Sequence, residues 1–526
     1  MLSLIALAAP ALACGGLFCD NVEPVDQTGE TILFDVDEAQ HQVEVQVRIA
    51  YQGPPGDFAW ILPTPAEPDL FVGSNALFDA LDGVTRPRLE LIRDGLGCTA
   101  DSGSTSSGDD DDASAVTSDA TGVRIVTQRR VGPFDATVLT ATDAAELTAW
   151  LTDHGYDLPA GFGDVVGAYL APGVHFLALR LASDATSGEI VPIGLRYAGD
   201  HPSIPLRLTS VAATEDMPVD VYVLGPARAV PLNYLHVRLN PLALPYWQDA
   251  TPLPERIARA ADEAGGHAFV TTYAAPQADP WHLFAEGTYD TAGLATIADP
   301  AAFVDALPDH GFFGTSELLD VLLVHLPPPE GVDPTDFYDC PGCYDEAYDA
   351  LAATFDPAAA AADLEARIVE PLRRAQARLD QHPYVTRLQT AVSPHEMTVD
   401  PMFGFNPDLP PVSNVHRAVV SRRCVGSEER EHPRTLEVTG LPALQLPPID
   451  QMTTSDAQWV DERVVHTAVV VEQLSESGPG EVMADFSGEI LWGRTWTAPG
   501  CGCTTGGASP AALLLLLPLA WTRRRR

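Results

Sequence analysis

Strictly alternating apolar and polar residues mark the first part of the chain. Within residues 42–50, Val43, Val45, Val47 and Ile49 fall on one side of an extended chain, with polar residues between them. A half-buried strand has this period of two, so residues 31–36 and 42–50 are predicted to pair as antiparallel strands. Similar short runs predict further strands around Trp60 and at 123–128, 136–140, 174–181, 189–197, 205–210 and 219–224.

The period changes between about residues 253 and 383. Apolar residues there recur at helical spacing, which predicts helices at 255–264, 300–307, 315–326, 345–355 and 358–379. In the last of these, Leu364, Ile368 and Leu372 form one apolar stripe, and Pro371 is expected to kink the helix. The Arg residues on its outer face are interpreted as local charge balance rather than as an anion site.

Strand signals return after residue 385, at 415–422, 435–438 and 463–473. The predicted fold class is therefore α+β, with an antiparallel β-rich framework (a sandwich or open sheets) and a mainly helical middle region. The helical block is either an insertion in this framework or a separate domain. The expected boundaries are a signal peptide at 1–13, a β-rich domain at 14–252, a helical region at 253–384, a β-rich region at 385–496 and a tag at 497–526. Residues 101–121 of the first domain, rich in Ser, Gly, Thr and Asp, are expected to be a disordered loop.

The N-terminus has the features of an export signal. Residues 2–13 are apolar and small, and Ala11-Leu12-Ala13 before Cys14 fits a secretory cleavage site, although no basic residue precedes the apolar run. Cys14 at this junction also allows lipoprotein acylation. That alternative calls for a Leu three positions earlier, where Ala11 stands.

The C-terminus has a three-part organisation. Gly500 to Gly507 are small residues that include Cys501 and Cys503, an apolar run follows at Ala511–Trp521, and Arg523–Arg526 end the chain. The apolar run is shorter than the roughly 20 residues of a comfortable membrane span, and a plain tail anchor is the simpler interpretation. The arrangement resembles the sorting tags of myxobacterial surface proteins. That resemblance implies a tag-processing protease and an anchor on Cys501 or Cys503. Arg523–Arg526 are expected to hold the tail on the cytoplasmic side, which leaves the body of the chain outside.

Six further cysteines suggest disulfides in an exported chain: Cys14, Cys19, Cys98, Cys340, Cys343 and Cys424. Cys14 and Cys19 are close enough in sequence to pair locally. Cys340-Pro341-Gly342-Cys343 admits a redox pair, half of a zinc site or a structural disulfide, and its expected position in a loop favours the structural disulfide.

The composition excludes several classes of reaction and partner. The chain of 526 residues carries a formal charge of −43, and all 30 of its basic residues are Arg. The absence of Lys excludes Schiff-base, pyridoxal-phosphate and P-loop chemistry. So negative a charge also argues against nucleic acids or an anionic lipid surface as partners.

A sequence-local catalytic or cofactor motif is absent, since no GxSxG, HExxH, GxGxxG, P-loop or EF-hand pattern occurs. The candidate catalytic residues are His395, Glu396 and Asp400, where His395 with either carboxylate has the groups for proton transfer. The alternative is an ordinary surface or capping feature. No cofactor and no metal is expected. The run Asp109–Asp112 allows a Ca²⁺ site but is better explained as a solvated loop.

Several segments resemble an uncharacterised exported bacterial family, the domain of unknown function 2330. They are Cys14-Gly15-Gly16-Leu17-Phe18-Cys19, 25–30, 51–53, 58–63, 131–135, 205–209, 386–388, 393–401 and 405–409. The resemblance spans most of residues 14 to about 415 and implies an exported single-family body. It implies no activity, cofactor or catalytic residue.

These observations predict an exported, disulfide-stabilised protein of the cell surface or outer envelope, anchored through its C-terminal tag. Its expected role is binding, adhesion or envelope structure without catalysis, with the export machinery as one partner and its ligand open. One alternative is a surface hydrolase whose site, around His395, is assembled from distant segments. The other is a calcium-dependent surface module.

Overall fold

The computed structural model describes most of the body of the chain. The described residues are 26–52, 59–73, 75–94, 124–131, 134–156, 158, 161–181, 191–276, 287–314, 316–381, 384–422, 434–448 and 452–489. The expected signal peptide, the Asp-rich loop, the C-terminal tag and Cys14, Cys19, Cys98, Cys424, Cys501 and Cys503 lie outside them.

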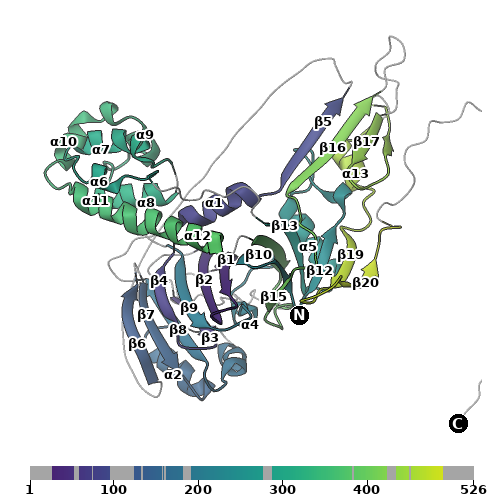
Figure 1. Ribbon diagram of the computed structural model, residues 1–526, viewed down its shortest axis with the longest axis horizontal. Helices are drawn as coiled ribbons and strands as arrows, with labels where there is room; N and C mark the ends of the chain where they lie inside the picture. The colour runs from purple at the N-terminus through teal and green to yellow at the C-terminus, as the bar shows by residue number, and fades with distance from the viewer. Residues whose placement is uncertain are drawn as a thin grey trace, which may run out of the picture.

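A ten-stranded sheet forms the centre of the molecule (Figure 1). Its order is β20 (Glu481–Asp485), β19 (Ala468–Gln473), β12 (Leu235–Leu239), β13 (Ala268–Pro276), β14 (Tyr384–Val392), β10 (Met217–Gly225), β1 (Asp26–Asp37), β2 (Gln42–Gln52), β9 (Ile193–Ala198) and β4 (Asp69–Val72). Strands β1 and β2 pair antiparallel as the alternation predicts. The pairs β1–β10 and β12–β13 are parallel, so the framework is mixed, with mainly antiparallel pairs.

A second sheet packs on one face of the central sheet and makes a sandwich. It consists of β3 (Ala59–Thr64), β8 (His175–Leu181), β7 (Phe134–Thr140) and β6 (Arg124–Val131). Ile32, Phe34 and Val45 of the central sheet share a buried apolar core with Trp60 and Leu177 of the second sheet. Helices α2 (Ala144–Asp153) and α3 (Phe162–Val166) cover the far side of the second sheet. Asp143 caps α2, since its side chain accepts hydrogen bonds from the Ala145 and Glu146 N–H groups.

Helices pack against the opposite face of the central sheet and extend away from it (Figure 1). They are α1 (Asn75–Thr85), α6 (Thr291–Leu294), α7 (Pro300–Ala306), α8 (Ser316–His325), α9 (Pro334–Asp339), α10 (Asp345–Leu351), α11 (Pro357–Leu364) and α12 (Glu370–Gln381). Their core joins Leu33 and Tyr222 of the sheet to Phe78 and Leu322 of the helices. In Figure 1 the helices α6 to α11 form a green lobe at one side of the sheet. The middle of the chain is thus mainly helical, but β13 interrupts it as an interior strand of the central sheet.

The long helix expected at 358–379 is broken by a π-helical turn, Glu365–Val369. Pro371 follows within the first turn of α12 and has no N–H to donate to a carbonyl of the preceding turn, which accounts for the wider π geometry just before it. Arg373 on the outer face pairs with Glu365 and Glu370, which agrees with local charge balance.

A third sheet consists of β18 (Leu444–Leu446), β17 (Arg434–Val438), β16 (Val415–Arg422) and β5 (Arg88–Asp94). It buries Val420, Leu436 and Leu446 together with Trp459 of α13 (Asp456–Asp461). A two-stranded ribbon, β11 (Arg228–Pro231) with β15 (Phe403–Asn406), lies on the central sheet beside β12, β13 and β14.

One of the expected strands is wrong, and another begins later than expected. Residues 205–210 form a single helical turn, α4 (Leu206–Thr209), in which Thr209 N donates to Pro205 O and Ser210 N to Leu206 O. Two apolar residues separated by one polar residue fit either element, and the φ angle of Pro205 suits the start of a helix. Residues 463–467 turn after α13, so the last long strand begins at Ala468. Across the described part of the chain, no helix is both long enough and apolar enough to cross a membrane.

Candidate functional site

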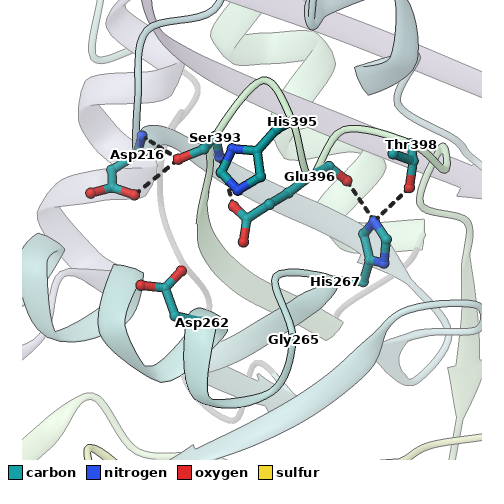
Figure 2. A pocket seen from close by; sticks show the side chains of 8 residues that line it. All are labelled: Asp216, Asp262, Gly265, His267, Ser393, His395, Glu396 and Thr398. Carbon is teal, nitrogen blue, oxygen red and sulfur yellow. Dashed lines mark hydrogen bonds between the residues drawn. The ribbon is translucent and has the colours of Figure 1, made fainter.

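A cavity of about 640 Å³ opens where three segments that are distant in sequence meet. The segments are the turn before β10, the stretch from the end of helix α5 (Leu253–Glu263) to the start of β13, and the turn after β14. Figure 2 shows the lining residues, which are Asp216, Asp262, Gly265, His267, Ser393, His395, Glu396 and Thr398. Three carboxylates and two imidazoles therefore converge from parts of the sequence that are far apart.

The turn after β14 is held by two reciprocal hydrogen bonds. Ser393 N donates to Glu396 Oε2 at 2.9 Å, and Glu396 N donates back to Ser393 O at 2.9 Å. This arrangement resembles a helix capping box, which uses a side chain to satisfy a backbone donor. It fixes the Glu396 carboxylate at the cavity wall and leaves His395 at the exposed tip of the turn.

Ser393 also joins the turn to the start of β10. Its Oγ accepts a hydrogen bond from Asp216 N at 3.1 Å and donates to Asp216 Oδ1 at 3.2 Å. Asp216 has a φ of 51°, in the left-handed region that Asp tolerates better than most residues. The neighbouring residues Met217 and Val392 are partners in the β10–β14 ladder, so the sheet itself places Asp216 beside Ser393.

His267 supports the turn from the start of β13. Its Nε2 lies 2.5 Å from Glu396 O and 3.1 Å from Thr398 Oγ1. Because a carbonyl oxygen only accepts, Nε2 carries the proton and donates it to Glu396 O. The ring also packs edge-on against Tyr234, with centroids 5.0 Å apart. His267 is therefore a structural donor, and its Nε2 has no lone pair free to act as a base.

Negative charge dominates the cavity. Burial raises the pKa of Asp262, and the nearby charges of Glu396 and Asp216 raise it further, while His395 opposes them. Of the eight lining residues in the structure, none is an Arg that could neutralise these carboxylates. An arrangement of this kind favours a positively charged group in the cavity.

The end of α5 lies close to the turn after β14 at this site. Gly265 and Gly266 end α5 with φ values of 87° and 84°, which favour glycine. A Cβ on Gly266 would lie 2.3 Å from Glu396 Oε1, so a larger residue here would push the Glu396 carboxylate out of its present position.

The candidate residues separate in the structure. His395 and Glu396 both line the cavity, but Asp400 does not. Asp400 Oδ1 accepts hydrogen bonds of 2.9 Å from Tyr169 Oη and of 2.9 Å from Arg207 N. Burial raises the pKa of Asp400. This carboxylate therefore ties the segment after the cavity to α4 and its surroundings.

Sequence reasoning missed Asp216, Asp262, His267 and Thr398. The first three lie at or beside the ends of β10, α5 and β13, and Thr398 lies in the turn segment after β14. No fixed spacing links the four. The Gly265-Gly266 pair after α5 was the only local sign of a close approach. Among the residues that the structure describes, no group of three or more His, Cys, Asp or Glu could hold a metal ion.

Cys340 and Cys343 form a disulfide. This agrees with the structural interpretation and leaves no free thiolate pair for half of a zinc site. The preceding residues, expected to be a loop, instead form α9. Asp333 caps the N-terminus of this helix, since its side chain accepts hydrogen bonds from Thr335 N and Asp336 N. Pro334 then occupies the first helical position, where its missing N–H costs nothing.

A model of one protein family matches residues 8–404 of the chain. The family is described as "Uncharacterized protein conserved in bacteria (DUF2330)". No curated protein and no solved structure matches the chain.

Proposed function

We propose that this chain, which belongs to the uncharacterised bacterial family DUF2330, is an exported cell-surface protein whose His395 cavity binds a cationic ligand. Export is supported by the apolar N-terminus before Cys14 and by the three-part C-terminal tag. The disulfide Cys340–Cys343 suits an oxidising compartment outside the cytoplasm. A role in adhesion or envelope structure is compatible with the same location.

The hydrogen bonds within the cavity wall favour ligand binding over catalysis. Glu396 Oε2 holds Ser393 N, Ser393 Oγ is bonded to Asp216, and His267 Nε2 donates to Glu396 O. A nucleophile needs a neighbouring base with a free lone pair. These bonds instead make a preformed wall, and preorganised walls suit ligand binding.

The ligand class follows from the charge of the wall. Asp216, Asp262 and Glu396 face the same space in Figure 2, and their mutual repulsion contributes to the raised pKa of Asp262. A bound ammonium or amidinium group relieves that repulsion and offers several donors to carboxylate and hydroxyl acceptors. The observation that carries the proposal is this convergence of three carboxylates in one cavity.

Calorimetric titration of the purified body with spermidine tests the proposal. Asp262→Asn removes one charge from a side chain exposed in the cavity, and it is expected to weaken binding at least tenfold. Asp349→Asn on the exposed side of α10 removes the same charge elsewhere and should leave the affinity unchanged. Equal affinities for the two variants would show that only the overall negative charge attracts the amine. Binding is also expected to weaken with added salt.

Cell fractionation tests the location. The proposal expects the protein in the envelope fraction, with replacement of Cys501 and Cys503 by Ser releasing it. A cytoplasmic protein with all thiols reduced would overturn the surface assignment. Calorimetric titration with CaCl₂ tests the alternative of a calcium-dependent module. The described residues contain no cluster of ligands for such an ion.

A further inference from the structure

A second polar cluster lies between the central sheet and the β11–β15 ribbon, away from the His395 cavity. Thr271 Oγ1 lies 3.0 Å from His236 Nε2, and His236 Nδ1 lies 2.9 Å from Glu472 Oε1. Arg228 Nη2 donates to Thr271 Oγ1 at 3.2 Å. The four residues come from β11, β12, β13 and β19, so only the folded sheet brings them together.

The hydrogen bonds define one consistent proton arrangement. The Glu472 carboxylate only accepts, so His236 carries its proton on Nδ1, and its Nε2 accepts from the Thr271 hydroxyl. Burial lowers the pKa of His236, with Arg228 adding to this effect and Glu472 opposing it. The hydrogen bond from His236 lowers the pKa of Glu472. A neutral imidazole oriented by an anionic carboxylate is the form that a general base requires.

Arg228 supplies a positive charge beside the hydroxyl. Its side chain is 6 % exposed, and Nη1 donates to Pro410 O at 3.1 Å. Within the described part of the chain, Arg228 Nε is a buried donor without a hydrogen-bond partner. Unmatched buried donors are uncommon, and one beside a nucleophile can hold a developing oxyanion.

We infer that Thr271, His236, Glu472 and Arg228 form a hydrolytic site for small carboxylic esters, beyond the proposed binding function and independent of it. Thr271 Oγ1 attacks the ester carbonyl carbon while its proton passes to His236 Nε2, and the oxyanion forms beside Arg228. The carbon–alkoxide bond then breaks, and the leaving alcohol takes the proton from His236. His236 then removes a proton from water, and the hydroxide attacks the carbonyl carbon of the threonyl ester. The acid is released as the proton on His236 returns to Thr271 Oγ1.

The cluster is covered by two surface segments, so access depends on their opening. Thr271 is 8 % exposed and His236 is 3 % exposed. Pro410 of one segment contacts Arg228, and a Cβ on Gly480 of the other would lie 3.0 Å from Glu472 Oε2. Hydrogen bonds join the two segments, among them Gly478 N to Asp408 Oδ2 at 2.7 Å and Asn406 Nδ2 to Ser475 O at 2.6 Å.

The test measures p-nitrophenyl acetate hydrolysis and fluorophosphonate labelling with the labelled residue mapped by mass spectrometry. Thr271→Val keeps the shape of the side chain without its hydroxyl, and it should lower the protein-dependent rate at least a hundredfold and abolish labelling at residue 271. Thr271→Ser restores a hydroxyl and should retain the rate and the label. Asp408→Ala removes one hydrogen bond between the two segments that cover the cluster, and it should raise the rate at least threefold.

The rate of the wild-type protein should persist below pH 6.5, because the base is an imidazole whose pKa is lowered by burial. Circular dichroism reports whether each variant is folded, independently of hydrolysis and of ligand binding. The inference is overturned if folded Thr271→Val hydrolyses and labels like the wild type. It is equally overturned if neither the wild type nor the Asp408→Ala variant reacts at residue 271.

Discussion

The Tyr169 hydroxyl donates a hydrogen bond of 2.9 Å to Asp400 Oδ1 and thereby holds this carboxylate outside the cavity that contains His395. The same oxygen accepts from Arg207 N at 2.9 Å. Asp400 therefore joins the turn after β14 to α4 and to η2 (Gly167–Tyr169), which follows α3. Its role is to join these segments of the fold, and the carboxylates that line the cavity are those of Asp216, Asp262 and Glu396.

Asp400→Ala is expected to destabilise the fold. The substitution leaves Tyr169 Oη and Arg207 N without their acceptor, which costs about 1–3 kcal/mol for partly buried groups. His395→Ala at the exposed tip of the same turn should stay within about 0.5 kcal/mol of the wild type. Urea unfolding measures both, and equal values for the two variants would remove the assigned role of Asp400.

The sequence predicted local elements well where one short segment contains the whole signal. Val43, Val45 and Val47 form the apolar face of β2, although Glu44 and Gln46 on its other face are buried as well. The class, α+β with a mainly helical middle, follows from the same patterns. Pro205-Leu206-Arg207-Leu208 was misassigned because a short apolar run fits one helical turn as well as a strand.

The cavity was only partly predictable for a different reason. His395 and Glu396 are adjacent in sequence, so one segment was enough to single them out. Asp216 and Asp262 reach the same space through the β10–β14 ladder and the packing of α5, which no spacing rule encodes. The Thr271, His236 and Glu472 cluster depends in the same way on the order of β13, β12 and β19 in the sheet.

Glu30 should make stability depend on pH. Burial raises its pKa from 4.5 to about 7, so between these values the folded protein binds more protons at this site than the unfolded chain. Stability from this group is fully present below pH 4.5 and is lost as the pH rises through 7. Glu30→Gln should remove this dependence and stabilise the protein at pH 8 by up to about 3 kcal/mol.

Urea unfolding at pH 5, 6, 7 and 8 checks the effect of Glu30. Glu38→Gln, at an exposed position just after β1, is the matched control and should follow the wild-type curve. A Glu30→Gln curve parallel to that of Glu38→Gln would show that the buried carboxyl does not titrate in this range.

The buried pair Arg367–Glu317 should respond differently to single and double substitution. Arg367 Nε donates to Glu317 Oε1 at 2.7 Å, and Asn75 N at the start of α1 donates to Glu317 Oε2 at 3.2 Å. The Glu317 side chain is fully buried. Arg367→Ala leaves this carboxylate without its cation and should cost about 3–5 kcal/mol.

Replacing both partners by Leu removes the buried charge altogether, so the double variant should be more stable than Arg367→Ala alone. Thermal and urea unfolding of both variants provide the comparison. If the double variant is less stable than Arg367→Ala, then the ion pair itself contributes more to the stability of this helical core than the unpaired buried carboxylate costs.

Reduction of the Cys340–Cys343 disulfide should have a small effect that stays within the helical lobe. The bond closes a loop of only four residues, and in the chain-entropy description such a short loop stabilises by about 2 kcal/mol at most. The helices around it pack in the apolar core that they share with the central sheet, and there Phe337 and Tyr348 stack with ring centroids 4.4 Å apart. The double variant Cys340→Ser, Cys343→Ser should therefore keep the far-ultraviolet circular dichroism of the wild type and lose no more than this amount in urea unfolding. Loss of the helical signal on substitution, or a cost above about 4 kcal/mol, would mean that the lobe depends on the disulfide to fold.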